Sequence, residues 1–184
     1  STVRAAFGGF WGARNLALLR LMGGEYKKGH KIRLGAEAMH LTRHTDYALR
    51  LLMLLAVEPE ALHTIEEVAR RYEISRNHMM KVAQTLAQNG FVESLRGRGG
   101  GLRLARAPEE ISLGAVVRAC EDNFALVECF DPAKNTCRIA PACGLKGPLE
   151  EALGAFLAVL DEYTLADLVK KPGSFGRIRR LIPA

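Results

Sequence analysis

The sequence lacks the features that define several large classes of protein. No stretch reaches the roughly 18 uncharged apolar residues of a membrane-spanning helix, so we expect no membrane contact. No C-x-x-C redox pair, glycine-rich phosphate loop or cysteine–histidine–acid set is present, which argues against an enzyme. Because no secretory signal is recognisable, we expect a cytoplasmic protein whose cysteines serve metal or redox chemistry rather than a disulfide framework.

The positive charge is unevenly distributed along the chain. Of the net +6, residues 1–38 contribute seven Lys or Arg against two Asp or Glu. This segment shows no sustained apolar period, and we interpret it as a non-native or disordered extension before a natural start at Met39. Residues 70–106 are basic, 120–168 are mainly acidic, and 171–184 form a basic tail. This charge distribution favours a basic half that binds DNA and an acidic half that senses a signal or pairs with a second chain.

The apolar pattern predicts a mainly α-helical domain over residues 39–119. Apolar side chains recur at three- and four-residue steps after Thr42, which can cap a first helix, and Pro59 ends that helix. Thr64 and Glu67 have the spacing of a capping box, which predicts the start of a second, short helix.

The following segment has the pattern of a helix-turn-helix with a wing. Ser75 begins a third helix, and Asn89-Gly90 ends it through a left-handed cap. A tight turn at 73–74 joins this helix to the one before, as in a helix-turn-helix. Residues 91–95 and 101–105 alternate like two strands on either side of a basic, glycine-rich tip. The predicted fold class is a winged helix-turn-helix domain, mainly α with a small β-hairpin wing.

The start of the third helix and the wing tip carry the candidate contacts to double-stranded DNA. Arg76 can bind a guanine edge, Asn77 an adenine edge or a phosphate, and Lys81 a phosphate. The alternatives are a capped, solvated helix start and a charged turn that serves only solubility. Two basic elements flanking one motif favour an operator-binding surface. The candidate residues are Ser75, Arg76, Asn77, His78, Lys81, Arg96, Arg98, Gly99, Gly100 and Arg103.

Residues 120–147 are predicted to form a cysteine-bearing loop, and three of the four cysteines lie in its irregular part, residues 123–147. Cys129, Cys137 and Cys143 follow the spacing C-x₇-C-x₅-C, without the C-x₂₋₄-C pair and fourth Cys or His of structural zinc sites. Three thiolates at this wider spacing suit an iron–sulfur cluster that leaves one iron with a weaker or non-cysteine ligand. Cys120 lies on a predicted helix, where we expect a buried structural thiol.

The C-terminal segment 148–170 has the apolar spacing of a long dimerisation helix. A stripe at four- and three-residue steps would join two chains into a homodimer, whereas the alternative is a helix that folds back onto its own core. The stripe consists of Leu149, Leu153, Phe156, Leu160 and Tyr163.

Taken in order, these features resemble the winged-helix iron–sulfur transcription regulators. The matching runs cover nearly all of 41–169: LTRHTDYALRLLMLLA, SRNHMMKVAQTLAQNGFV, RGRGGGLRLAR, CFDPAKNTCRIAPACGLKGPL and LDEYTLADLV. The resemblance implies a homodimeric repressor with a cluster at the dimer interface, held by Cys129, Cys137 and Cys143. It also implies that nitric oxide is the effector, and that DNA binding is lost when it attacks the cluster.

Two positions refine this resemblance. Some members with a [4Fe–4S] cluster complete its coordination with an aspartate from the partner's first helix, which matches Asp46; a helix-surface carboxylate or local salt bridge is the open alternative. Cluster-assembly regulators of the family carry a histidine three residues beyond the third cysteine, where this chain has Lys146. We therefore favour [4Fe–4S] over [2Fe–2S] and a nitric oxide sensor over a sensor of iron or iron–sulfur cluster supply.

Overall fold

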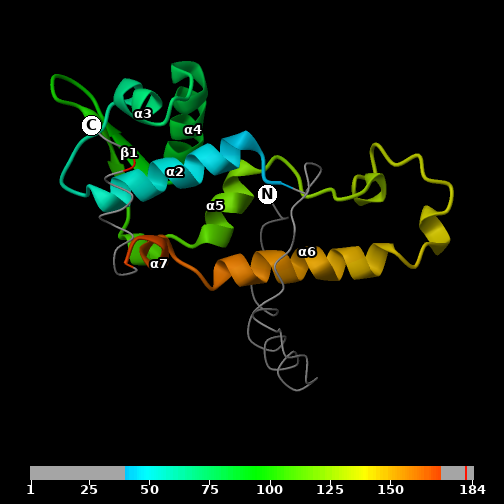
Figure 1. The fold of residues 1–184 in the computed structure, drawn as a ribbon. Coiled ribbons are helices and arrows are strands. Elements are labelled where there is room, and N and C mark those ends of the chain that lie inside the picture. Colours follow the sequence, from blue (N-terminus) through cyan, green and yellow to red (C-terminus); the bar gives the residue numbers. More distant parts are fainter. Residues whose placement is uncertain (1–39, 171–180, 182–184) are drawn as a thin grey trace, which may run out of the picture. The chain divides into compact units, whose positions relative to one another are not determined.

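The computed structural model describes residues 40–170 and Leu181. The expectations for the extension 1–38, for Met39 and for the tail 171–184 apart from Leu181 lie outside the described residues. The helices are α2 (Arg43–Val57), α3 (Ile65–Arg71), α4 (Arg76–Gln88), α5 (Leu113–Cys120), α6 (Lys146–Asp161) and α7 (Leu165–Val169), and the strands are β1 (Val92–Leu95) and β2 (Gly101–Leu104) (Figure 1). Short 3₁₀ turns occur at Pro108–Glu110, Glu128–Phe130 and Ala140–Ala142.

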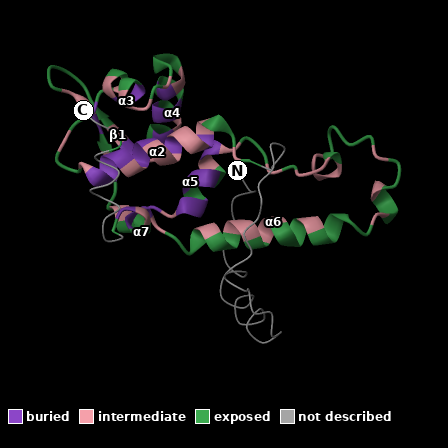
Figure 2. Cartoon of the chain, viewed as in Figure 1, coloured by how far each residue is buried: buried purple, intermediate pink, exposed green. Residues whose placement is uncertain are grey.

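Helix α2 lies at the centre of the core and contacts α4, α5 and α7. Its apolar residues recur at helical spacing, so Ala48, Leu51, Leu52 and Leu55 are all buried on it (Figure 2). The helix ends at Val57, two residues before Pro59, which was predicted to end it.

Side-chain oxygens cap four of the helices, which explains where these helices begin. The hydroxyls of Thr42, Thr64, Ser75 and Ser112 each accept a hydrogen bond from the backbone N–H three residues on. The expected capping box at Thr64 is formed only by half, because the Glu67 carboxylate binds side chains instead of the Thr64 backbone.

The two helices of the helix-turn-helix, α3 and α4, end in the same way. At the end of α3, Glu73 N–H donates to Arg70 O and Ile74 N–H donates to Ala69 O, which is the Schellman arrangement. Glu73 takes the left-handed position with φ 55° although it is not glycine. The end of α4 repeats this pattern at Gly90, with φ 68°, and the next residue Phe91 enters the core. The left-handed end at Gly90 is the one the sequence predicts.

The wing is an antiparallel hairpin that also pairs with the segment before α3. Val92 faces Leu104 and Leu95 faces Gly101 across the two strands. His63 adds a short bridge to Leu102, with hydrogen bonds in both directions. The mainly α winged helix-turn-helix fold is therefore confirmed.

The expected single helix over 148–170 is two helices in the structure. Helix α6 ends at Asp161, and Thr164 then opens α7 through a capping box with Asp167. The break lets Leu165 and Val169 enter the core beneath α2. Burial of these apolar side chains favours the turn over a continued, solvated helix. No helix within the described residues is long and apolar enough to cross a bilayer.

Candidate nucleic-acid interface and cysteine loop

The first turn of α4 presents polar side chains to solvent above a buried layer. Ser75, Arg76 and Asn77 are exposed, whereas Met79 is fully buried and fixes the helix to the core. His78 is half-buried, and its ring meets that of Tyr47 edge-on at a centroid distance of 5.1 Å. Of the predicted contacts on this turn, Arg76 and Asn77 therefore have free access to a ligand, while His78 also packs against α2.

The basic residues of 70–106 divide into internally paired and solvent-directed groups. The Arg71 side chain is 3% exposed and lies between carboxylates, and Arg103 binds Glu93 on the neighbouring strand. Within the described residues, no hydrogen bond or ion pair engages the side chains of Arg76, Lys81, Arg96 and Arg98. Four exposed cations thus lie on α4 and the wing tip, and Arg103 has a partner that a phosphate would have to displace.

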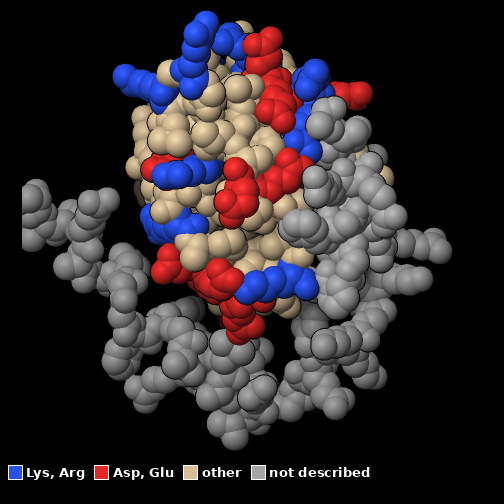
Figure 3. Space-filling view, turned by 90° about the vertical axis from the view of Figure 1, so that its left-hand side faces the viewer, with Lys and Arg blue, Asp and Glu red and all other residues tan. Residues whose placement is uncertain are grey.

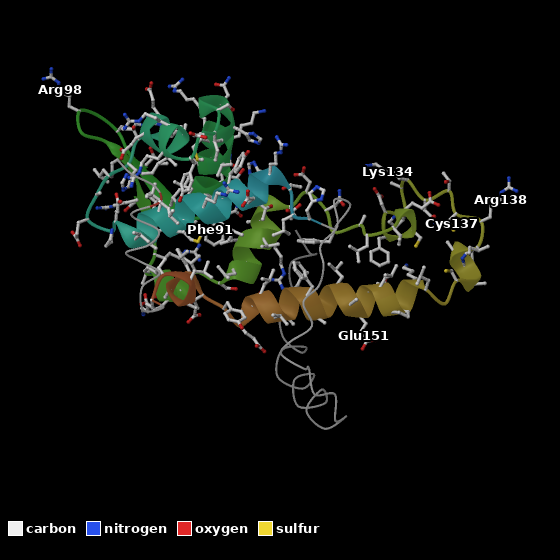
Figure 4. The ribbon with its side chains drawn as sticks, in the orientation of Figure 1. Phe91, Arg98, Lys134, Cys137, Arg138 and Glu151 are labelled. Atoms are coloured by element: carbon white, nitrogen blue, oxygen red, sulfur yellow. The ribbon has the colours of Figure 1, made fainter. Side chains whose placement is uncertain are left out.

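The wing tip is shaped by glycines that no other residue replaces easily. Gly99 has φ 75°, a left-handed conformation that costs a side-chain-bearing residue about 1–2 kcal/mol. A Cβ on Gly100 would collide with the carbonyl oxygen of Leu95 across the turn. The tight tip projects Arg98 away from the rest of the domain, as Figure 4 shows. This shape suits insertion of an arginine into a narrow groove.

Acidic and basic side chains are mixed on the face seen in Figure 3, where carboxylates lie between groups of Lys and Arg. Bulk charge therefore does not outline a DNA-binding surface there. Helix α4 differs, because its sequence RNHMMKVAQTLAQ contains no Asp or Glu. A surface without carboxylates can approach phosphates and base edges without like-charge repulsion.

Helix α2 supports α4 from behind. His44 Nε2 lies 3.1 Å from Thr85 Oγ1 in a hydrogen bond, and the Tyr47 ring contacts His78 two turns earlier on α4. Burial, followed by the neighbouring charge of His78, lowers the pKa of His44 from its ordinary value. The neutral ring is favoured near pH 7, which suits a hydrogen bond between uncharged groups.

A buried charge cluster, which was not predicted from the sequence, links α2, α3 and the wing. His63 is 2% exposed, and its two ring nitrogens lie 3.2 Å from Glu58 Oε2 and 3.1 Å from Glu67 Oε1. Arg71 binds both carboxylates, with the shortest distance of 2.8 Å to Glu58. Because the His63 backbone pairs with Leu102, this cluster fixes β2 to the helix-turn-helix. The signal available in the sequence was the i, i+4 spacing of His63, Glu67 and Arg71, which does not include Glu58.

The cysteine loop holds three partly exposed, unpaired thiols, Cys129, Cys137 and Cys143. Cys129 lies in the turn Glu128–Phe130, and Cys143 directly follows the turn Ala140–Ala142. Figure 4 shows Cys137 in the loop between them. Among the described residues, no three His, Cys, Asp or Glu side chains are gathered closely enough to hold a metal ion. The three thiols are suitable metal ligands as thiolates, but a single chain in this conformation does not bring them together.

Cys120 differs from the loop cysteines, as expected. It is 6% exposed within the core, and burial raises the pKa of its thiol to about 11. A thiol that resists deprotonation is a poor metal ligand, since thiolate is the binding form.

Asp46 lies on the surface of α2 in an ion pair with Arg50. The shortest distance between the two side chains is 2.6 Å, and the Asp46 side chain is 45% exposed. The local salt bridge considered from the sequence is thus present. The carboxylate also remains accessible to a second chain.

The apolar stripe of α6 is only half covered by its own chain. Leu149, Leu153, Phe156 and Leu160 are partly exposed, and no residue of α6 is buried. Tyr163 lies beyond the end of α6 and is 47% exposed. The last turn of α6 is fixed to α5 by the Arg118–Asp161 ion pair, at 2.6 Å.

A helix-turn-helix followed by a β-hairpin wing defines the class of winged-helix DNA-binding proteins. The model of the Rrf2 family, described as iron-dependent transcriptional regulators, matches residues 41–171. The chain belongs to this family, and is thus a transcriptional regulator rather than an enzyme.

Individual relatives agree with this assignment. The "HTH-type transcriptional regulator NsrR" of Bacillus subtilis is 59% identical over 72% of this chain and 91% of its own length. The protein of the same name in Halalkalibacterium halodurans is 50% identical over 79% of this chain and 100% of its own. Among solved structures, "T. potens IscR" is 26% identical with a TM-score of 0.59, over 74% of this chain and 90% of that one.

Proposed function

We propose that this protein is a cytoplasmic, homodimeric repressor that binds a double-stranded DNA operator and releases it when nitric oxide nitrosylates an iron–sulfur cluster. The observation that carries the proposal is the set of three unpaired, partly exposed cysteines in a winged-helix regulator 59% identical to a protein named NsrR. This pairing of a DNA-binding fold with accessible thiols is the expected composition of a repressor that senses through a cluster.

The operator would be bound by α4 in the major groove and by the wing beside it. Arg76 and Asn77, with Ser75 and His78 on the same turn, reach base edges, and Lys81 reaches a phosphate. The tip contributes Arg96 and Arg98 from a backbone that its glycines, Gly99 and Gly100, bring close to the duplex. Arg103 would exchange its carboxylate partner for a phosphate.

The cluster would be held by Cys129, Cys137 and Cys143, with Asp46 of a second chain as the fourth ligand of a [4Fe–4S] form. The donor set supports this assignment, because thiolates are the ligands of such clusters and Cys120 is buried in its protonated form. When bound, the cluster supplies iron atoms with which nitric oxide reacts. A carboxylate is a weaker iron ligand than a thiolate, so the Asp46 position is where the coordination would be most open to attack.

The homodimer would form along α6. Its apolar stripe of Leu149, Leu153, Phe156 and Leu160, continued by Tyr163, remains half exposed in one chain. A second copy would remove this apolar area from water and would bring one chain's Asp46 to the other's cysteine loop.

A chain of contacts can link the cysteine loop to α4. Glu121, the first residue after α5, accepts hydrogen bonds from the Thr42 backbone N–H at 2.8 Å and from its hydroxyl at 3.2 Å. Thr42 caps α2, and α2 in turn holds α4 through His44 and Tyr47. A rearranged loop would therefore alter the capping of α2 and the position of α4 relative to its half-site.

The decisive experiment is a nitric oxide titration of protein purified anaerobically. The cluster's absorption and the protein's affinity for its operator are expected to change together. The affinity is measured by fluorescence anisotropy on a duplex that the protein selects from random sequences. As matched variants, Arg76→Ala should weaken specific binding and Arg98→Ala should weaken binding more evenly across sequences. Protein that contains no iron or sulfide, or that keeps its operator after full nitrosylation, would contradict the sensor.

A second function is favoured by the family description and by the likeness to IscR. The protein would then respond to iron or cluster supply, with the same DNA-binding surface. Under this alternative, the protein with its cluster and the protein without it would differ in operator affinity. Nitric oxide at substoichiometric ratios would leave that affinity unchanged.

A further inference from the structure

Helix α4 exposes a large apolar side chain in the middle of its polar face. Met80 is 45% exposed, whereas its neighbour Met79 is completely buried. Arg76 and Gln84, one turn before and after Met80, are both exposed, as is Lys81 beside it. Met80 thus contributes little to the core and stands alone among polar and cationic side chains.

The surroundings of Met80 indicate which kind of partner would cover it. Helix α4 carries no carboxylate, and Arg76 and Lys81 have no ion-pair partner within the described residues. This charge is complementary to a polyanion rather than to an average protein surface. The C5-methyl group of thymine is the apolar group that base pairs present in the major groove. A flexible thioether side chain is well suited to contact it.

We propose that Met80 is a specificity-determining residue that contacts the methyl group of one thymine in each operator half-site. The proposal rests on the operator-binding function proposed above and adds to it a base preference. Gln84, one turn further along the same face, can form the paired hydrogen bonds that select adenine. The geometry points to a half-site that contains an adenine and a thymine opposite this part of α4.

The test replaces single thymines by deoxyuridine, which removes only the methyl group. The probe is a duplex that full-length wild-type protein selects from random sequences, and affinity is measured by fluorescence anisotropy. Deoxyuridine at one position of a half-site is expected to weaken wild-type binding about fourfold, the effect of uncovering one methyl group. Met80→Ala should bind the parent duplex more weakly and should not respond to deoxyuridine at that position.

Leu62→Ala is the matched control, since Leu62 is also an exposed apolar residue, at 36%, but lies in the loop before α3. This variant should keep the full deoxyuridine response. The proposal is overturned if no thymine responds in the wild type, if Met80→Ala responds as the wild type does, or if Met80→Ala binds DNA normally because another partner covers this face. Unchanged binding by Arg76→Ala and Arg98→Ala would instead overturn the proposed interface itself.

Discussion

Replacement of Arg71 by Met should destabilise the fold more than any surface charge change, because Arg71 is the buried partner of two carboxylates. Its guanidinium lies 2.8 and 3.1 Å from the oxygens of Glu58 and 3.4 Å from Glu67. Hydrogen bonding to Glu58 is the largest contribution that raises the pKa of Arg71, so the side chain stays charged at every relevant pH. Methionine keeps much of the aliphatic volume but leaves the carboxylates beside His63 without this cation.

The expected cost follows from the burial of the carboxylates. Loss of one partner from a fully buried ion pair costs about 3–5 kcal/mol. The Glu58 and Glu67 side chains are 17% and 28% exposed, so water reaches them in part and lowers the penalty. We therefore expect Arg71→Met to reduce the free energy of unfolding by about 2–3 kcal/mol.

Urea unfolding followed by circular dichroism, at one fixed protein concentration, measures this change. The double variant Arg71→Met with Glu58→Gln also removes the charge of Glu58, the nearer of the two carboxylates, and should recover at least about 1 kcal/mol relative to the sum of the single variants. A loss below about 1 kcal/mol for Arg71→Met, or strict additivity in the cycle, would refute the view that this cluster is a coupled buried network.

Four other predictions address the cluster, the dimer and the fold. Alanine at any one of the three loop cysteines should abolish or severely deplete iron and sulfide, whereas Cys120→Ala should retain the cluster, as iron analysis would show. Phe156→Glu should give monomers or aggregates in sedimentation, because a charge would be buried in the stripe of α6; a stable dimer would disprove that interface. Glu73→Gly should stabilise the helix-turn-helix by about 0.5–1 kcal/mol, since φ 55° suits glycine, and equal stability of both proteins would contradict it. The hydrogen bond from Arg118 lowers the pKa of Asp161 in the folded protein, and because both side chains are over 40% exposed the pair contributes below about 1 kcal/mol of stability. This contribution is present above the unfolded-state pKa of Asp161 and is lost as pH falls through its folded-state pKa. The free energies of unfolding of the wild type and of Asp161→Asn should therefore converge at that low pH.

The elements that the sequence predicts well depend on local chemistry. Hydroxyl caps at Thr42, Thr64 and Ser75 act on an amide three residues away, and Gly90 permits a left-handed helix end by itself. Periodicity likewise placed the buried face of α2. These signals require no knowledge of distant residues, so they can be found in one sequence.

The break between α6 and α7 shows where such local interpretation was incomplete. The apolar stripe suggested one continuous helix, yet Thr164 and Asp167 have the spacing of a helix start. The decisive contribution comes from distant residues, because the turn before α7 is fixed by hydrogen bonds from Leu113 to Tyr163 and from Leu165 to Ile111. Periodicity alone cannot show such pairings.

The candidate site divides in the same way. The sequence identifies candidate thiol ligands and candidate DNA-binding cations, since thiols and guanidinium groups are recognisable residue by residue. It does not reveal that His63, Glu58, Glu67 and Arg71 meet, because this contact depends on how the end of α2 approaches α3. The assembly of the three cysteines is a similar question, because in the proposed sensor it would depend on a bound cluster and on a second chain.

Helix α2 is the element through which the two parts of the proposed sensor would communicate. Its N-cap residue Thr42 binds Glu121 at the beginning of the cysteine loop, and its first two turns hold α4 through His44 and Tyr47. Asp46, the proposed ligand to the partner's cluster, lies between these two contact residues. Loss of that ligand bond in a dimer would therefore act on the same turn of α2 that positions α4. In this proposal, coupling through α2 would require no direct contact between the cysteine loop and the DNA.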